Sequence, residues 1–314
     1  MPKILITGAS GFVGHRLALY LSAKGLDVRC AYRKLPDNRF GDAVSIGSIG
    51  AETDWTDALK GCDVVVHLAG HVGSRGVPDE YFSEVNDRGT SRLVEQAQTS
   101  HVRLLINAST IAVVTGHASR SVVNDQTPTG NYSVYGRSKL AGENHIAKFV
   151  EIDRHAISLR PPMLYGDHAS GNWRLLKRVA ASGVPLPLST FRNRRNLMAV
   201  DNFVHAVALL ATMDHDKVRS GAYAIADQEA VSTADIVRLM RYRMQRPALL
   251  FPFPPSFLSI ALGLIGQRSA ADSLIGDLEI DSGNFRKTFN WQQPLTAQEA
   301  ISGKSLLFPS QNIR

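Results

Sequence analysis

The feature that most constrains the fold is a short apolar strand that runs directly into a glycine-rich turn and then into an amphipathic helix. The strand is Lys3–Thr7, the turn is Gly8-Ala-Ser-Gly-Phe-Val-Gly14, and the helix is expected over Phe12–Ala23. Glycines permit a tight bend and a close approach to a pyrophosphate, and the free N–H groups at a helix N-terminus attract an anion. With a second apolar strand at residues 28–31, this order predicts a dinucleotide-binding unit.

Apolar runs and helical patterns alternate along the first half of the chain. Short, uninterrupted apolar runs are typical of strands that are buried on both faces of a parallel sheet. Right-handed crossovers through the intervening helices predict an α/β fold, a doubly wound parallel sheet of the Rossmann type. The expected strands are residues 4–6, 28–31, 43–46, 64–68, 104–108 and 156–159, and the expected helices are residues 12–24, 56–60, 78–100 and 133–153.

The alternation loosens after Pro161-Pro162, where prolines separate shorter elements. We therefore expect an NAD(P)-binding Rossmann domain at residues 1–166, to which residues 196–226 return. A smaller, mostly C-terminal substrate-binding lobe is expected from residues 167–195 and 227–314. The apolar run at residues 257–265 is shorter than the ~20 residues that span a bilayer, which predicts a buried helix or a lid over the substrate.

Composition limits the class of protein. An apolar content of 44% supports a sizeable core, and no basic-then-apolar export signal precedes the first strand, so a cytoplasmic location is expected. Cys30 and Cys62 are expected to be free thiols. The net charge of +7 is not concentrated in one long basic run, which argues against nucleic-acid binding. The densest basic cluster, Arg192 with Arg194 and Arg195, fits either a solvated loop or an anion site.

Tyr135 and Lys139 lie four residues apart in a predicted helix, so their side chains share one face. A nearby ammonium group favours the phenolate and lowers the pKa of a tyrosine from its reference value of about 10. The pair therefore fits an acid/base site. The spacing also arises by chance on solvated helix faces, and only the surrounding motifs distinguish the two interpretations.

A set of motifs in a fixed order resembles the extended short-chain dehydrogenase/reductases, the NAD-dependent epimerase/dehydratase family. The motifs cover nearly the whole chain. Tyr135-Gly-Arg-Ser-Lys-Leu-Ala-Gly-Glu143 and the residues 193–202 are most similar to bacterial nucleotide-sugar 4-epimerase-like proteins and proposed 4-ketoreductases. The motifs are Thr7 to Gly14, His67-Leu-Ala-Gly70, Asn86 with Gly89-Thr90, Ser109-Thr110, Tyr135 with Lys139, and Arg160-Pro-Pro-Met-Leu-Tyr-Gly166.

The resemblance implies a catalytic set of Thr110, Tyr135 and Lys139, with Ser109 as the neighbouring alternative to Thr110, and no metal ligand. Thr110 would hold the reacting oxygen, Tyr135 would move the proton, and Lys139 would hold the nicotinamide ribose and lower the pKa of Tyr135. Asn86 resembles a structural or proton-relay asparagine. The implied cofactor-binding residues are Gly8, Ser10, Gly11, Phe12, Val13, Gly14, Arg33, Leu68, Ala69, Gly70, Tyr135, Lys139 and Pro162.

For the substrate, the resemblance implies that Thr110 contacts the sugar and that Asn172 and Arg195 contact the diphosphate of a nucleotide sugar, because a guanidinium fork suits phosphate. Ile111 follows Thr110 where sugar 4,6-dehydratases carry an acidic pair, which argues against a dehydratase. Arg33 stands where NAD-binding members carry an acidic residue at the end of the second strand, so NADP(H) is favoured and NAD(H) is the alternative.

These observations predict an NAD(P)-dependent oxidoreductase acting on a nucleotide-diphosphate sugar. The leading hypothesis is a 4-ketoreductase of a UDP-4-keto-6-deoxy-hexosamine in surface polysaccharide biosynthesis. The first alternative is a nucleotide-sugar 4-epimerase, which needs the same three residues, and the second is a non-catalytic dinucleotide-binding regulator. By analogy, a homodimer is expected through the helices at residues 78–100 and 133–153. The apolar positions that would permit it include Leu93, Val94, Leu140, Ile146 and Phe149.

Overall fold

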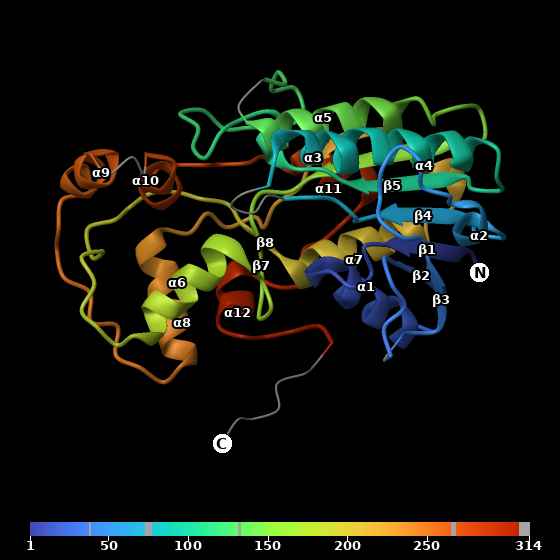
Figure 1. Cartoon of the computed structure of the whole chain (residues 1–314). Helices are drawn as coiled ribbons and strands as arrows, with labels where there is room; N and C mark the ends of the chain where they lie inside the picture. The colour runs from blue at the N-terminus through green and yellow to red at the C-terminus, as the bar shows by residue number, and fades with distance from the viewer. Residues whose placement is uncertain (38, 73–76, 131–132, 265–267, 308–314) are drawn as a thin grey trace.

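A seven-stranded, wholly parallel sheet forms the centre of the molecule in the order β3-β2-β1-β4-β5-β6-β9 (Figure 1). The computed structural model describes residues 1–37, 39–72, 77–130, 133–264 and 268–307. The strands are β1 (Lys3–Thr7), β2 (Asp27–Tyr32), β3 (Asp42–Ser45), β4 (Val64–His67), β5 (Leu104–Ala108), β6 (His155–Arg160) and β9 (Gly221–Ala224), and β7 (Leu164–Tyr165) pairs with β8 (Met198–Ala199) in a separate ladder.

The helices between the strands confirm the predicted doubly wound architecture. The predicted helix at residues 78–100 is divided into α3, a π-helical turn and α4. The helix predicted at residues 12–24 matches α1, whereas the helix predicted at residues 133–153 ends earlier, at Ala147. The helices are α1 (Phe12–Ala23), α2 (Thr56–Leu59), α3 (Asp79–Ser83), the π-helical turn Glu84–Arg88, α4 (Gly89–Gln98), α5 (Val134–Ala147), α6 (Gly171–Ala181), α7 (Val200–Ala211), α8 (Thr233–Arg243), α9 (Pro255–Leu264), α10 (Arg268–Ile275), α11 (Gly283–Phe289) and α12 (Ala297–Ile301), with 3₁₀ turns at Ile111–Val113 and His215–Lys217.

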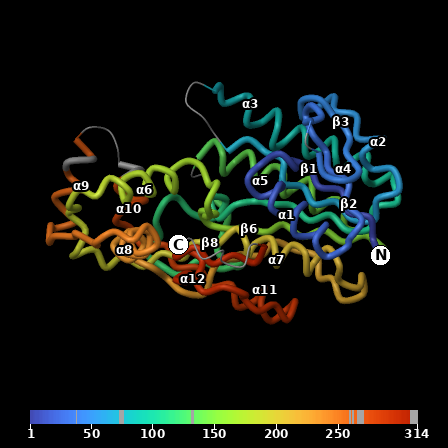
Figure 2. Tube along the Cα trace, turned by 90° about the horizontal axis from the view of Figure 1, so that it is seen from below, coloured from blue at the N-terminus to red at the C-terminus, as the bar shows by residue number. Residues whose placement is uncertain are grey.

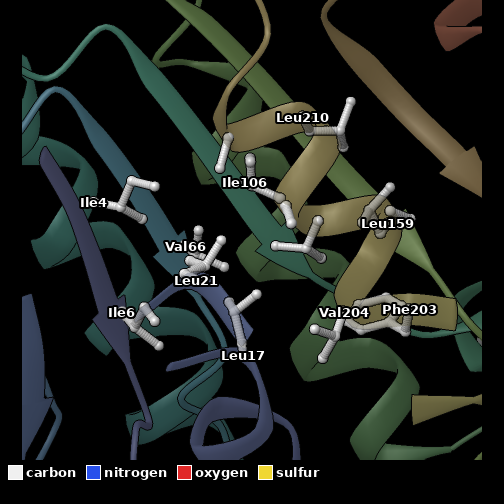
Figure 3. Packing of buried hydrophobic residues seen from close by; sticks show 14 of the residues in the cluster. Ile4, Ile6, Leu17, Leu21, Val66, Ile106, Leu159, Phe203, Val204 and Leu210 are labelled. Carbon is white, nitrogen blue, oxygen red and sulfur yellow. The ribbon is translucent and has the colours of Figure 1, made fainter. Parts of the chain in front are cut away.

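Alternate residues of the central strands belong to two separate apolar layers, one on each face of the sheet, because successive side chains of a strand point to opposite faces. Ile4 and Ile6 of β1 pack with Leu17 of α1 and Phe203 of α7 on one face (Figure 3). Leu5 belongs to the opposite layer, which α4 and α5 cover. Burial on both faces explains why these strands are continuous apolar runs in the sequence.

The apolar positions that we expected at a dimer interface are used inside the chain. Leu93, Val94, Ile146 and Phe149 are buried in the layer beneath α4 and α5, and Leu140 packs against a neighbouring apolar cluster. These residues therefore form no exposed apolar face, and the homodimer stays a prediction.

The smaller lobe lies at the end of the sheet where the strands finish, on the side of the molecule away from the N-terminus (Figures 1 and 2). Its own core contains Tyr165, Trp173, Phe191 and Met240. The run at residues 257–265 is not the expected buried helix in its described part, because Phe257, Ile260 and Leu264 of α9 are exposed. The lid, which was the alternative, stays a prediction, and residue 265 lies outside the described residues.

Candidate active site

The glycine-rich turn lies between β1 and α1 and is too crowded for larger residues. Gly8 has φ +69°, and a Cβ there would lie 2.8 Å from the backbone nitrogen of Ala69. A Cβ on Gly14 would lie 2.2 Å from the carbonyl oxygen of Gly8. Gly11 is the N-cap of α1 and provides no side-chain cap for the first N–H groups of the helix. This cradle fits the pyrophosphate of a dinucleotide.

The segment Leu68-Ala-Gly70 follows β4 and forms the wall opposite Gly8. It is held by a buried hydrogen-bond chain. Ala69 N donates to Thr7 Oγ1 at 3.1 Å, Thr7 Oγ1 lies 2.8 Å from His67 Nδ1, and His67 Nε2 lies 3.2 Å from Thr90 Oγ1. Because the Thr90 hydroxyl donates to the carbonyl of Asn86, we assign the proton of His67 to Nε2. Burial lowers the pKa of His67 to about 3, so the ring is neutral.

Tyr135 lies in the first turn of α5, against the residues that follow β5. The hydroxyl of Ser133 caps this helix by accepting from Gly136 N at 2.9 Å. A Cβ on Gly136 would lie 2.4 Å from the carbonyl oxygen of Ala112, so the glycine lets α5 approach the Thr110 segment closely. The side chains of Tyr135 and Thr110 are hydrogen-bonded to each other.

Thr110 rather than Ser109 is therefore the hydroxyl that faces the tyrosine. Ser109 Oγ is buried without a hydrogen-bond partner among the described residues. Thr110 Oγ1 also accepts from Ala112 N at 3.2 Å, which fixes its rotamer at the carboxyl end of β5. The structure thus brings Thr110 and Tyr135 together, as expected for two groups that share one reacting oxygen.

The expectation that Lys139 lowers the pKa of Tyr135 is wrong for the protein without its cofactor. Burial raises the pKa of Tyr135 to about 12, and the hydrogen bond from Thr110 only partly opposes that rise. Lys139 is itself 5% exposed, and burial lowers its pKa to about 8 against the opposing charge of Glu143. Desolvation, which disfavours the charged form of either group, is the larger effect at both residues.

A buried ion pair joins α5 to the end of β6. Arg160 Nη2 at the end of β6 lies 2.6 Å from Glu143 Oε2, and Arg160 Nε lies 3.0 Å from Glu143 Oε1. Both side chains are under 10% exposed. Since Glu143 is one turn after Lys139, the pair locks the back of α5 against the sheet and puts a carboxylate near the lysine. Sequence analysis did not identify this pair, because only the fold brings β6 beside α5.

Asn86 connects the cofactor wall to the catalytic helix. Its Oδ1 accepts from His71 N at 2.7 Å, and its Nδ2 donates to His71 O at 2.8 Å and to Ser138 Oγ at 2.9 Å. The π-helical turn, which adds a residue to the helix, buries this side chain. The arrangement fits the structural role that the resemblance implied for Asn86.

The remaining predicted cofactor residues come from the same edge of the sheet. Arg33 directly follows β2 and is exposed, and Pro162 follows β6 and is buried. The segment Gly8–Gly14, the residues 68–70 and Thr110 follow β1, β4 and β5. Carboxyl ends of parallel strands are where doubly wound sheets bind ligands, so the topology places all these residues around one cleft edge.

The two residues that were predicted to contact a diphosphate lie in the smaller lobe and differ in burial. Asn172 is exposed in the first turn of α6. Arg195 is buried, and its guanidinium donates to the carbonyls of Gly276 at 2.7 Å, His117 at 2.8 Å and Asp272 at 3.2 Å. The structure brings neither residue into the hydrogen-bond network around Tyr135 that the described residues form. Their role toward a diphosphate stays a prediction.

A cavity of about 450 Å³ lies beside the glycine-rich turn, between α1 and the smaller lobe. Ser10 and Phe12 line it on one side and Trp173 and Arg243 on the other. Thr110, Tyr135 and Lys139 are not among its lining residues, so this cavity is separate from the proton-transfer residues.

In the part of the chain that the structure describes, no His, Cys, Asp and Glu side chains gather in a group that could hold a metal ion. No described helix combines the length and the apolar character that crossing a membrane requires. The predicted free thiols are confirmed, since Cys30 and Cys62 are both buried and unpaired as a disulfide.

Comparison with known proteins identifies the family. Residues 4–226 match the model of the NAD dependent epimerase/dehydratase family. The chain belongs to this family. A UDP-glucose 4-epimerase of Vibrio cholerae is similar over 100% of this chain and 98% of its own length, at 30% identity. The resemblance stated from the motifs is therefore confirmed.

Solved structures of the family share the fold. A UDP-N-acetylglucosamine 4-epimerase from Bacillus cereus superimposes with a TM-score of 0.77, at 19% identity, over 96% of this chain and 97% of its own. A UDP-glucuronic acid 4-epimerase from Bacillus cereus in complex with NAD gives 0.75, at 19% identity, over 96% and 94%. The chain is thus an enzyme of the extended short-chain dehydrogenase/reductase type, in an NAD-dependent family.

Proposed function

We propose that this enzyme exchanges a hydride with C4 of a UDP-linked hexose while Tyr135 moves a proton to or from the oxygen on that carbon. The observation that carries the proposal is the hydrogen-bonded pair of Thr110 and Tyr135 beside the buried Lys139. The nicotinamide supplies or accepts the hydride. Thr110 holds the sugar oxygen, and Lys139 holds the ribose of the cofactor.

The protonation state of Tyr135 fits the reduction of a ketone. With a pKa of about 12, the phenol carries its proton at neutral pH in the protein without cofactor. A protonated phenol is the acid that a ketone needs as it becomes an alcohol, a step that a 4-ketoreductase and a 4-epimerase share. We put first a 4-ketoreductase that acts on a UDP-4-keto-6-deoxy-hexosamine, as expected for surface polysaccharide biosynthesis, because of the residues at the end of β2.

The end of β2 supports NADPH as the reductant. Arg33 is exposed there, next to the exposed Lys34, and the strand ends on Tyr32 without an acidic residue. A carboxylate at this position favours the ribose 2′-OH of NAD, whereas an arginine accommodates a 2′-phosphate. The family is NAD-dependent as a whole. The proposed preference of this enzyme for NADP therefore rests on Arg33 and not on the family.

The second candidate is a nucleotide-sugar 4-epimerase. The Vibrio cholerae relative, which is similar along its whole length, favours it. An epimerase uses the same Thr110, Tyr135 and Lys139 but returns the hydride to the other face of the sugar, so no net reductant is consumed. A non-catalytic regulator is the least supported alternative, because the hydrogen-bonded pair of Thr110 and Tyr135 would have no task in it.

One assay distinguishes these candidates. The purified protein receives NADPH with UDP-4-keto-6-deoxy-N-acetylglucosamine and, separately, NAD⁺ with UDP-glucose or UDP-N-acetylglucosamine. Absorbance at 340 nm and chromatography of the sugars are followed. Stoichiometric loss of NADPH supports the reductase, and interconversion of sugars at constant absorbance supports the epimerase. If NADPH is not consumed and no sugar is interconverted with any of these substrates, the proposal of a UDP-hexose enzyme is contradicted.

Arg33→Ala tests the cofactor preference. The variant should bind NADPH at least about tenfold more weakly, because a charge-assisted contact to the 2′-phosphate is lost, while its affinity for NADH should be unchanged. Fluorescence titration with each nucleotide gives both dissociation constants. Lys60→Ala, an exposed basic residue after α2, is the control and should alter neither. Equal weakening of both nucleotides by Arg33→Ala would remove the 2′-phosphate argument.

A further inference from the structure

The smaller lobe differs sharply from the rest of the chain in charge. Residues 168–200 and 236–271 contain 11 of the 35 Lys and Arg residues and none of the 28 Asp and Glu residues. The remaining chain, with 24 basic and 28 acidic residues, is net acidic. The whole positive charge of the protein therefore comes from these two segments, which we call the acid-free segments.

The acid-free segments lie side by side. The backbone of Leu186 exchanges hydrogen bonds with Leu249 and Phe251, and Arg241 donates to the carbonyl of Val184 at 2.6 Å. Their helices α6, α8 and α9 gather at the end of the molecule opposite the N-terminus (Figures 1 and 2). The basic residues of these segments are thus gathered at one end of the structure, where some of them pair with Asp167 and Glu279.

The same end exposes an unusual share of apolar surface. Among the described residues, sixteen large apolar side chains are exposed, and eight of them belong to the acid-free segments. Single exposed apolar residues are ordinary, but a contiguous group is typical of an interaction surface. The eight are Leu175, Val184, Tyr242, Leu249, Phe251, Phe257, Ile260 and Leu264.

Helix α9 presents the most apolar part of this surface. Phe257, Ile260 and Leu264 are 63%, 60% and 84% exposed, and their spacing of three and four residues puts them on one face. Leu258 packs on the core of the lobe, so the helix is attached by its other side. No charged residue occurs between Arg246 and Arg268.

The length of α9 decides between crossing a bilayer and lying on it. At 1.5 Å per residue, ten residues reach about 15 Å, half of the hydrocarbon thickness. Pro254 and Pro255 prevent the helix from extending backwards. A short helix whose exposed face is apolar, on a lobe with an excess of arginine, can rest in the interface between head groups and acyl chains.

We propose that the exposed face of α9, with the exposed arginines of the same acid-free segments, docks this enzyme on a bilayer that contains anionic phospholipid. Arg192 donates to the carbonyl of Ser189 at 2.9 Å, in the strand-like segment that pairs with residues 249–253, and Arg246 directly precedes the uncharged stretch. Both are exposed. They would meet lipid phosphates while Phe257, Ile260 and Leu264 enter the acyl boundary.

Vesicle sedimentation with the full-length protein tests the proposal. We expect binding to vesicles of phosphatidylcholine with one third phosphatidylglycerol, and much weaker binding to phosphatidylcholine alone. The triple variant Phe257→Ser, Ile260→Ser, Leu264→Ser should lower the partition coefficient by about tenfold or more, because its apolar insertion is lost. Arg192→Gln and Arg246→Gln should each lower it by about fivefold at low salt.

Matched substitutions at the opposite end of the molecule serve as controls. Val150 and Ile152 are exposed apolar residues outside the lobe, and Lys60 and Lys148 are exposed basic residues outside it. Serine at the first two and glutamine at the other two should leave vesicle binding unchanged. Melting temperature and mass by light scattering establish that each variant is folded and in the same oligomeric state.

Three results would overturn the proposal. The first is equal sedimentation with neutral and anionic vesicles, and the second is equal sedimentation of the wild type and the triple variant. The third is a smaller oligomer in the triple variant without any vesicle effect, which would assign the face to contact between copies of this chain. Vesicle binding is measured without substrate, so the outcome does not depend on the proposed reaction.

Discussion

Tyr135 shows how far an environment can change the behaviour of a residue. Its spacing from Lys139 predicts a lowered pKa, yet burial raises the pKa of the phenol to about 12. Burial also lowers the pKa of Lys139 to about 8, which weakens the lysine as a permanent cation above that pH. The protein alone therefore keeps Tyr135 as an acid, and the charge of an oxidised nicotinamide would be needed to favour the phenolate.

Tyr135→Phe tests the assignment of the proton donor. The substitution removes the hydroxyl but keeps the ring, so the fold should persist while kcat falls by roughly 10²- to 10⁴-fold. Steady-state kinetics with the substrate that the wild type turns over provide the measurement. Tyr242→Phe removes an exposed hydroxyl of the lobe and should behave as wild type. Near-normal turnover of Tyr135→Phe would show that another group transfers the proton.

Asp227 predicts a pH dependence of stability. Its carboxylate is buried among Tyr165, whose hydroxyl donates at 2.9 Å, Asn202, whose amide donates at 2.7 Å, and Ala199 N. Burial nevertheless raises the pKa of Asp227 to about 6. Since the folded pKa exceeds the unfolded value, the folded state binds more protons between pH 4 and 6, and stability falls as pH rises through that window.

Asp227→Asn measures this contribution. The variant should be less stable than wild type, because an amide cannot accept from all three donors. The difference in the free energy of unfolding should shrink by up to about 3 kcal/mol as pH rises from 4 to 6, since only the wild type loses its protonated carboxyl. Urea denaturation at intervals across this range gives both curves. A constant difference would show that Asp227 titrates at an ordinary pKa.

At the scale of elements, α5 is positioned by two glycines. Gly136 contacts the carbonyl of Ala112, and a Cβ on Gly142 would lie 2.6 Å from the carbonyl of Asn86. Backbone oxygens cannot move away as a flexible side chain can, so a methyl group at either site displaces the helix. The sequence Tyr-Gly-Arg-Ser-Lys gives no sign of this requirement, because a glycine in a helix is equally a weak helix former.

Gly136→Ala should separate Tyr135 from Thr110. We expect a fall in kcat/KM of at least about tenfold, because small errors in the placement of catalytic groups are costly, and a lowered melting temperature. Gly263→Ala is the matched control: a Cβ on Gly263 of α9 would meet no atom of the described residues within 4 Å, and alanine there should leave activity unchanged and stabilise the helix. Unaltered kinetics in Gly136→Ala would mean that the helix is not held by this contact.

At the scale of the whole molecule, Arg195 joins the lobe to the loop that follows the catalytic strand. Its guanidinium links the carbonyls of Asp272 and Gly276 at the end of α10 to His117. Burial lowers the pKa of Arg195, because desolvation disfavours the charged guanidinium and outweighs the nearby carboxylate of Asp277. The motif around it led us to expect a phosphate ligand, whereas the tertiary structure uses its donors to connect two segments.

Arg195→Ala separates these two roles. Loss of three partly buried hydrogen bonds to backbone carbonyls should lower the free energy of unfolding by about 3 kcal/mol, measured by chemical denaturation. Arg194→Ala is the control, because its exposed ion pair with Glu279 is expected to contribute under about 1 kcal/mol. An unchanged stability with a raised KM for the nucleotide sugar would instead support the diphosphate role.

The sequence by itself determined the Rossmann sheet and the location of the chemistry. Strand β1, the turn Gly8–Gly14 and the pair Tyr135 with Lys139 are each specified by neighbours in the chain, and parallel strands must finish at one edge. Local spacing and backbone sterics contain that information, and the described strands follow the predicted apolar runs closely. The bulged turn at Glu84–Arg88 inside the predicted helix at residues 78–100 left no signal in that pattern.

Only the tertiary structure decided what surrounds each group. The ion pair of Arg160 with Glu143, the carbonyls around Arg195 and the exposure of α9 all depend on segments distant in sequence. The pKa of Tyr135 depends on them as well, because desolvation, the largest influence on that pKa, is a property of the packed environment. The sequence specifies which side chain stands at each position, whereas the fold sets the burial of that side chain and the groups that contact it.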